Sequence, residues 1–145
     1  RNDSTVLYPI TRHTTMQVRD IIVTVGGAKK TYKPRSVKDG VASLEDRSAG
    51  VAIGYNPLTV TSESLPQVRR VRIQARVNHL SQPASADSTG FTPGPKLDRY
   101  DEVDVIFKCN RRSATADRQA MVDLAKALLA HADVLAVVVD EDVLL

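Results

Sequence analysis

The chain lacks most residues from which disulfides, zinc sites and aromatic cores are built. It has a single cysteine, Cys109, no tryptophan, and aromatic residues make up only 4% of its 145 residues. One cysteine can form neither an intrachain disulfide nor a zinc site that needs several cysteines. The three histidines are scattered without the spacing of metal ligands, so we expect no metal and no other cofactor. The core must consist mainly of Val, Leu, Ile and Ala.

Long hydrophobic runs are also missing. The most apolar segment, residues 121–145, is interrupted by Asp123, Lys126, His131 and Asp133, so it does not resemble a membrane span. The first residues contain no apolar run of the kind found in secretory signals. We therefore expect a soluble protein made in a cytosol-like compartment, without a membrane partner.

No catalytic motif stands out. The pair Gly26-Gly27 is not followed by the lysine and the helix of a phosphate-binding loop. No nucleophile lies near a base in a recognisable pattern, and the carboxylates Glu102 and Asp104 share a strand face without an evident cleft. We expect that the protein is not an enzyme.

The composition nevertheless favours a folded domain. Hydrophobic residues make up 42% of the chain and charged residues 26%, which is enough apolar material for one core. The formal net charge of +3 and the pI of about 9.2 permit a nucleic-acid partner without requiring one. Residues 1–15 are polar and predict an extended or mobile arm, followed by a single domain at 16–145.

Strand-like segments fill the first two thirds of that domain. Gly26-Gly27 predicts a hairpin over 16–38, and Asp39-Gly40 predicts a second turn that leads into a sheet at 40–110. Alternation between polar and apolar residues is clearest over 69–80 and 99–110. These two strands flank the Ser-, Pro- and Gly-rich segment 81–98, which predicts a long loop.

The hydrophobic period changes from two to about 3.6 after this sheet. Apolar residues then recur at three- and four-residue steps, which predicts helices over 114–143 with a break near 131–133. The run Val137 to Val139 weakens the second helix, because β-branched residues prefer strands. Strands followed by helices, without βαβ alternation, predict an α+β fold with an antiparallel sheet.

Alternation assigns the two faces of the sheet. Val71, Ile73, Ala75 and Val77 point toward the helices, and Arg70, Arg72, Gln74 and Arg76 point away. On pattern alone, the polar face is most simply a solvated face. The evenly spaced arginines favour the other hypothesis, a surface whose guanidinium groups bind phosphates. Glu63, Glu102 and Asp104 on the same face oppose it unless they pair with the arginines or accept hydrogen bonds from bases.

Five segments in order, "DGVASLED", "PLTVTSESLP", "RVRIQARVN", "DEVDVIFKC" and "SATADRQAMVDLAKALLAHADV", resemble the coat proteins of single-stranded RNA bacteriophages of the levivirus type. The resemblance extends over residues 17–144. It implies an N-terminal β-hairpin, a five-stranded antiparallel sheet and two C-terminal α-helices. Two chains would form an interlocked homodimer with one continuous sheet, each chain's helices covering its partner. Dimers would assemble into an icosahedral T=3 shell, commonly of about 180 copies.

The resemblance also implies a function for the polar face. It would look inward and bind a stem-loop of the single-stranded genomic RNA, which represses replicase translation and marks the genome for packaging. The protein would be located in the virion, after assembly in the cytoplasm of the bacterial host. Carried over by position, the RNA-binding residues are Thr59, Thr61, Arg70, Arg72, Gln74, Arg76, Glu102, Asp104 and Lys108. Glu102 departs from the family, because it stands where some relatives have a stacking Tyr.

Two alternatives stay open. A non-viral dimeric RNA-binding regulator could use the same basic face without forming shells. Arg111-Arg112, at the junction between the last strand and the first helix, could pair with RNA or with an acidic neighbour.

Overall fold

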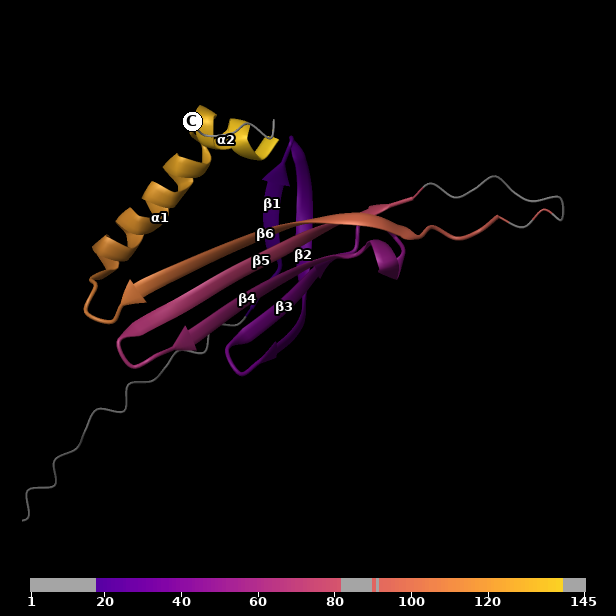
Figure 1. Ribbon diagram of the computed structural model, residues 1–145. Coiled ribbons are helices and arrows are strands. Elements are labelled where there is room, and N and C mark those ends of the chain that lie inside the picture. Colours follow the sequence, from indigo (N-terminus) through magenta and orange to yellow (C-terminus); the bar gives the residue numbers. More distant parts are fainter. Residues whose placement is uncertain (1–17, 82–89, 91, 140–145) are drawn as a thin grey trace, which may run out of the picture.

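The computed structural model describes residues 18–81, 90 and 92–139, so the expected N-terminal arm at 1–15 lies outside the described residues. The strands form one antiparallel sheet in which each strand pairs with the next along the chain (Figure 1). Their bounds are β1 Ile21–Val25, β2 Ala28–Lys38, β3 Val41–Asp46, β4 Asn56–Ser64, β5 Val68–Leu80 and β6 Leu97–Asn110. A short 3-10 helix, Ala52–Gly54, precedes β4, and the helices α1, Thr115–Leu129, and α2, Ala132–Val139, follow β6. The predicted α+β class is therefore confirmed.

The sheet has six strands, so the expected count of five is wrong. The reason lies in β2, which does not end where the hairpin ends. Its first part, up to Tyr32, pairs with β1, and its second part, from Lys33, pairs with β3. A register shift between Pro34 and Ser36 accompanies the change of partner, because proline cannot donate a ladder hydrogen bond. The hairpin thus continues into the main sheet and adds β1 as an edge strand.

Both predicted turns, at Gly26-Gly27 and Asp39-Gly40, are present, and each has two residues between its strands. Residues Asp39 and Gly40 link β2 to β3 with φ values of 50° and 79°, the left-handed pair of a type I′ turn. This turn also packs tightly against β4, since Ser62 N donates to Gly40 O at 2.8 Å. A Cβ on Gly40 would lie 2.6 Å from the backbone oxygen of Ser62, so glycine is required there for two separate reasons.

The buried core is small and lies over the middle of the sheet. Its buried apolar side chains are Tyr32, Leu44 and Leu58, from β2, β3 and β4, and Leu44 is the most deeply buried of them. Burial raises the pKa of the Tyr32 phenol, and the negative charge of Asp46 raises it further. Asp46 is itself buried and accepts hydrogen bonds from Ser48 and from the amide of Asn56. The hydrogen bond between Asp46 and Asn56 thus links the end of β3 to the start of β4, which the 3-10 helix precedes.

The helices begin and break close to where the sequence predicts. The backbone N–H of Ala114 donates to the carboxylate of Asp117 at 2.8 Å, which caps α1, and a turn at 130–131 separates α1 from α2. The β-branched run ending at Val139 is helical all the same. Neither helix has a buried residue. Figure 1 shows α1 leading away from the end of β6 and not packing flat against the sheet. Their apolar stripe is therefore not covered by the chain's own sheet.

Candidate nucleic-acid interface

Cross-strand pairing brings the predicted site residues together on one face of the sheet, the polar face. In an antiparallel pair, residues opposite one another point to the same side. Across β4, β5 and β6 the register places Thr59 opposite Gln74 and Gln74 opposite Asp104; Thr61 faces Arg72, Arg70 faces Lys108 and Arg76 faces Glu102. The structure thus assembles all the expected side chains on one surface, with β5 at its centre.

The opposite face is apolar, as the alternation predicts. Ile73 lies opposite Val60 on one side and Val105 on the other, and Ala75 lies between Leu58 and Val103. This apolar face is only partly buried within the chain, and 61% of Val103 is exposed. Cys109 is a half-buried free cysteine on the same face.

The arginines of the polar face are paired with carboxylates. Arg72 Nε lies 2.9 Å from Oδ1 and 3.0 Å from Oδ2 of Asp104. Arg70 Nε donates to Glu63 at 3.1 Å, and Arg76 Nη2 donates to Glu102 at 3.1 Å. Each of the three arginines therefore has an acidic partner, and the middle of the row is close to electrically neutral. Lys108 adds a further positive charge at one end.

These contacts shift the ionisation of the carboxylates. Hydrogen bonds from Gln74, at 2.8 Å, and from Arg76 lower the pKa of Glu102. The hydrogen bonds from Arg72 lower the pKa of Asp104, and the same carboxylate raises the pKa of Arg72. Both acids are thus held in the charged form that accepts hydrogen bonds.

Tyr100 also lies on this face, although it is not among the RNA-binding residues carried over from the family. It lies two residues before Glu102, on the same side of β6, with about half of its surface exposed. The guanidinium carbon of Arg76 lies 4.1 Å from the centre of its ring, a cation–π contact. Strand alternation would have found Tyr100, because it continues the series that ends with Glu102 and Asp104.

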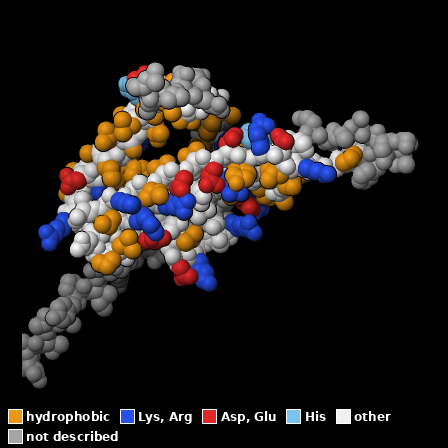
Figure 2. Space-filling model, in the orientation of Figure 1, with side chains coloured by type: hydrophobic (Ala, Val, Ile, Leu, Met, Phe, Trp, Pro, Cys, Tyr) orange, Lys and Arg blue, Asp and Glu red, His pale blue; other side chains and the backbone are white. Residues whose placement is uncertain are grey.

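Two shallow hollows adjoin on this face. One is lined by Thr59, Gln74, Arg76 and Glu102, and Pro57 lines both this hollow and a second one. The second is lined by Arg35, Glu45, Arg47, Ala52, Tyr55 and Asn78. The guanidinium of Arg47 lies 5.8 Å from the ring centre of Tyr55, so arginine–tyrosine contacts occur in both areas. On the side of the molecule drawn in Figure 2, Lys and Arg side chains lie interspersed with Asp and Glu side chains.

The described residues contain no cluster of His, Cys, Asp and Glu that could hold a metal ion. Within the same ranges, no helix combines the length and hydropathy needed to cross a membrane. The arrangement offers guanidinium forks, amides and hydroxyl groups on a rigid platform, beside carboxylates that can accept from base amino groups.

The chain matches the levivirus coat protein family over residues 12–142. It belongs to this family. Among solved structures, the fold is similar to a chain of the virus-like particle of bacteriophage ESE058, with a TM-score of 0.79 and 18% identity, over 90% of this chain and all of that one. A chain of the virus-like particle of bacteriophage NT-214 gives a TM-score of 0.78 and 17% identity, over 90% of this chain and 100% of the other.

A chain of the bacteriophage GA protein capsid is also similar, with a TM-score of 0.65 and 16% identity over 82% of this chain and 92% of that one. A search of curated proteins finds no match. The match to this family confirms the resemblance seen in the sequence, and the family is one of structural coat proteins. At these identities the solved structures show the levivirus coat protein fold alone.

Proposed function

We propose that this levivirus coat protein forms a homodimer, and that dimers assemble into the icosahedral shell of a virion around single-stranded phage RNA. The polar face is turned inward and contacts that RNA. Assembly takes place in the cytoplasm of the bacterial host, and the T=3 arrangement common in the family is the expected one. The observation that carries the proposal is the amount of apolar surface that a single chain leaves uncovered.

That surface is largest on the helices. Leu124, Leu128 and Leu129 of α1 are 60%, 53% and 58% exposed. Full burial of such a side chain contributes about 1.5–3 kcal/mol, and each of these leucines forgoes roughly half of that, because each is already partly covered. Contiguous apolar stripes of this kind are typical of protein–protein interfaces. A partner chain whose sheet presents its own half-covered apolar face would bury both surfaces at once.

The edge strand β6 supports the same arrangement. It spans Leu97–Asn110 and, among the strands that the structure describes, pairs with β5 alone. A long unpaired edge tends to pair with another strand. Pairing of β6 with β6 of a second copy would satisfy these backbone groups and join two sheets into one continuous surface. The dimer would then present two copies of the polar face side by side.

The composition of the polar face supports an RNA partner. A stem-loop of the genome would meet arginine forks that suit phosphates, and it would meet Asp104 and Glu102, which suit the amino groups of exposed bases. Such a mixed surface favours a defined RNA over any polyanion. Recognition of one stem-loop would in turn allow translational repression of the replicase and selective packaging.

The test compares Arg72→Ala and Arg76→Ala with Arg99→Ala, an exposed arginine of β6 that pairs with Asp98. Binding to phage-derived stem-loops is measured over a salt series. We expect the first two variants to remain dimeric but to lose affinity, with the salt slope reduced by about one unit for each lost phosphate contact. If RNA affinity and salt slope are unchanged in both variants, the polar face is a solvated surface that does not bind the RNA.

A further inference from the structure

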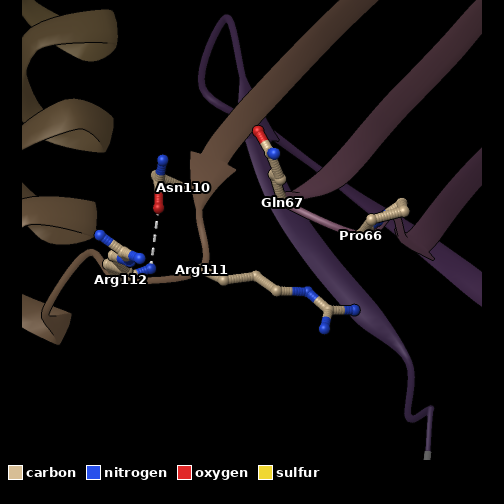
Figure 3. Close-up of a pocket in the computed structure, with 5 residues that line it drawn as sticks. All are labelled: Pro66, Gln67, Asn110, Arg111 and Arg112. Carbon is tan, nitrogen blue, oxygen red and sulfur yellow. Dashed lines mark hydrogen bonds between the residues drawn. The ribbon is translucent and has the colours of Figure 1, made fainter.

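A cleft lies at one end of the sheet, apart from the two hollows of the polar face, and none of its lining residues is among the nine RNA-binding residues carried over from the family. It is lined by Pro66 and Gln67 from the β4–β5 turn and by Asn110, Arg111 and Arg112 from the junction between β6 and α1. Figure 3 shows the side chain of Arg111 extended along the β4–β5 turn toward Pro66, with Gln67 on the other side of the opening. All five lining residues are exposed.

Hydrogen bonds hold the two walls of this cleft together. Arg111 N donates to Gln67 O at 3.1 Å, and Arg111 Nη2 donates to Ser64 Oγ at 2.5 Å. Arg112 N donates to Oδ1 of Asn110 at 2.9 Å, as the dashed line in Figure 3 shows. The junction is therefore tied to the turn by its backbone and by one guanidinium. The donors that line the cleft are the guanidinium groups of Arg111 and Arg112 and the side-chain amides of Gln67 and Asn110.

The charges at this end of the sheet are not balanced as they are in the middle. Its basic residues are Arg69 on the apolar side and Arg70, Lys108, Arg111 and Arg112, and its nearby carboxylates among the described residues are Glu63, the partner of Arg70, and Asp117, which accepts from Ala114 N at the start of α1. Among the ion pairs between described residues, none involves the other four. A local excess of positive charge in a concave site concentrates anions.

The cleft is continuous with the polar face. Arg70 lies opposite Lys108, and Asn110 is two residues further along β6, so Asn110 and Lys108 point to the same side. A polyanion that leaves the polar face along β6 would reach Asn110 and then the two arginines. The apolar face, by contrast, is the side that a partner's helices are expected to cover.

From this geometry we propose that the cleft of Gln67, Asn110, Arg111 and Arg112 binds a backbone phosphate of single-stranded RNA. This inference rests on the proposed function, which it extends from the middle of the polar face to its end. The cleft supplies affinity that does not depend on base sequence, because its donors suit a phosphate and its position lies beyond the carboxylates that could read bases. The sequence left an acidic neighbour open as the other partner of Arg111-Arg112, and among the ion pairs between described residues none involves either arginine.

The experiment measures binding of a fluorescent uridylate oligomer to the dimeric full chain over a salt series. The variants are Arg111→Gln and Arg112→Gln, with Arg99→Gln as the control of equal charge change at the far end of β6. We expect each of the first two to lower the salt slope by about one unit, and the control to bind like the wild type. Arg112→Lys should keep most of the slope, because it keeps the charge.

Arg111→Gln loses the contact with Ser64 and could fail to fold. In that case Arg112→Gln tests the cleft, because the hydrogen bond from Arg112 to Asn110 uses the backbone N–H and is kept in the variant. Normal RNA affinity in Arg112→Gln, together with weaker binding by Arg72→Ala, would overturn the cleft but leave the proposed function intact. Normal RNA affinity of Arg112→Gln with loss of shell assembly would show that Arg112 pairs with an acidic neighbour, and it would also overturn the proposed phosphate site. If the wild-type dimer binds no RNA, the proposed function fails and the cleft fails with it.

Discussion

Arg72 of β5 donates from Nε to both carboxylate oxygens of Asp104 on β6, although the residue opposite Arg72 in the register is Ile106. The contact is therefore diagonal and crosses the polar face between two neighbouring pairs of residues. Arg76 reaches Glu102 directly across, and Gln74 shares that carboxylate. RNA that binds this face must compete with these carboxylates for the arginines.

Replacing Asp104 with Asn should strengthen binding to RNA without a defined structure. The substitution removes a negative charge and leaves Arg72 without its acidic partner, so the salt slope should rise by about one unit. Fluorescence anisotropy with a uridylate oligomer measures both affinity and slope. Asp98→Asn, which frees Arg99 at the start of β6, is the matched control and should change little. Weaker or unchanged binding by Asp104→Asn would contradict this account of the ion pair.

The two carboxylates of the polar face should titrate at unusually low pH. Hydrogen bonds lower the pKa of Asp104 from its ordinary 3.8 and that of Glu102 from its ordinary 4.5. A pKa lowered by folding contributes stability above the ordinary value, and that stability is lost as the pH falls through the lowered one. Carbon-13 NMR of the side-chain carboxyl groups should show both midpoints below the ordinary values. In Arg72→Ala the midpoint of Asp104 should move back toward 3.8; an unmoved midpoint would show that Arg72 is not the cause.

Dimer formation should depend on the apolar stripe of α1. Leu128→Asp would bury an unpaired charge in the interface that we propose, so the variant should remain monomeric or fail to accumulate as a folded protein. Light scattering after size exclusion gives the mass in solution. Ala116→Asp introduces the same charge on an exposed position of the first turn of α1, where acidic residues are tolerated, and should leave the dimer intact. Intact dimers of Leu128→Asp would place the interface elsewhere.

The turn between β2 and β3 should tolerate only glycine at its second position. Gly40→Ala must place a Cβ 2.6 Å from Ser62 O in a left-handed backbone conformation, whereas a Cβ on Gly27, with φ of 80°, meets nothing within 4 Å. Gly27→Ala should therefore cost about 1 kcal/mol through backbone strain alone, and Gly40→Ala clearly more. Denaturant unfolding at one fixed protein concentration compares the two. Equal costs would mean that the clash with β4 relaxes freely.

The sequence predicts the strands, the turns and the composition of each face well, because these depend on local patterns. The Asp39-Gly40 turn and the alternation through β5 need only neighbouring residues to be recognised. The break between α1 and α2 follows from the interrupted apolar period in the same way. The continuous β2 was not predicted, since a strand that changes partner near Pro34 has the same local pattern as two separate strands.

The pairing of the arginines could not be predicted from one sequence either. Whether Arg72 meets Asp104 depends on the register between β5 and β6, which run antiparallel over Val68–Leu80 and Leu97–Asn110. Alternation fixes the side of the sheet but not the partner across it. The cleft beside Arg111 depends on two turns meeting at one end of the sheet, which only the folded chain shows.

Electron microscopy of the purified, unmodified chain tests the central claim most directly. If the chain is the subunit of a shell that encloses RNA, the preparation should contain closed particles a few hundred ångströms across, which resist ribonuclease and release RNA when they are dissociated. A non-viral regulator that uses the same polar face would give soluble dimers that bind RNA but form no particles. Dimers or monomers under every assembly condition, with RNA present, would contradict the claim.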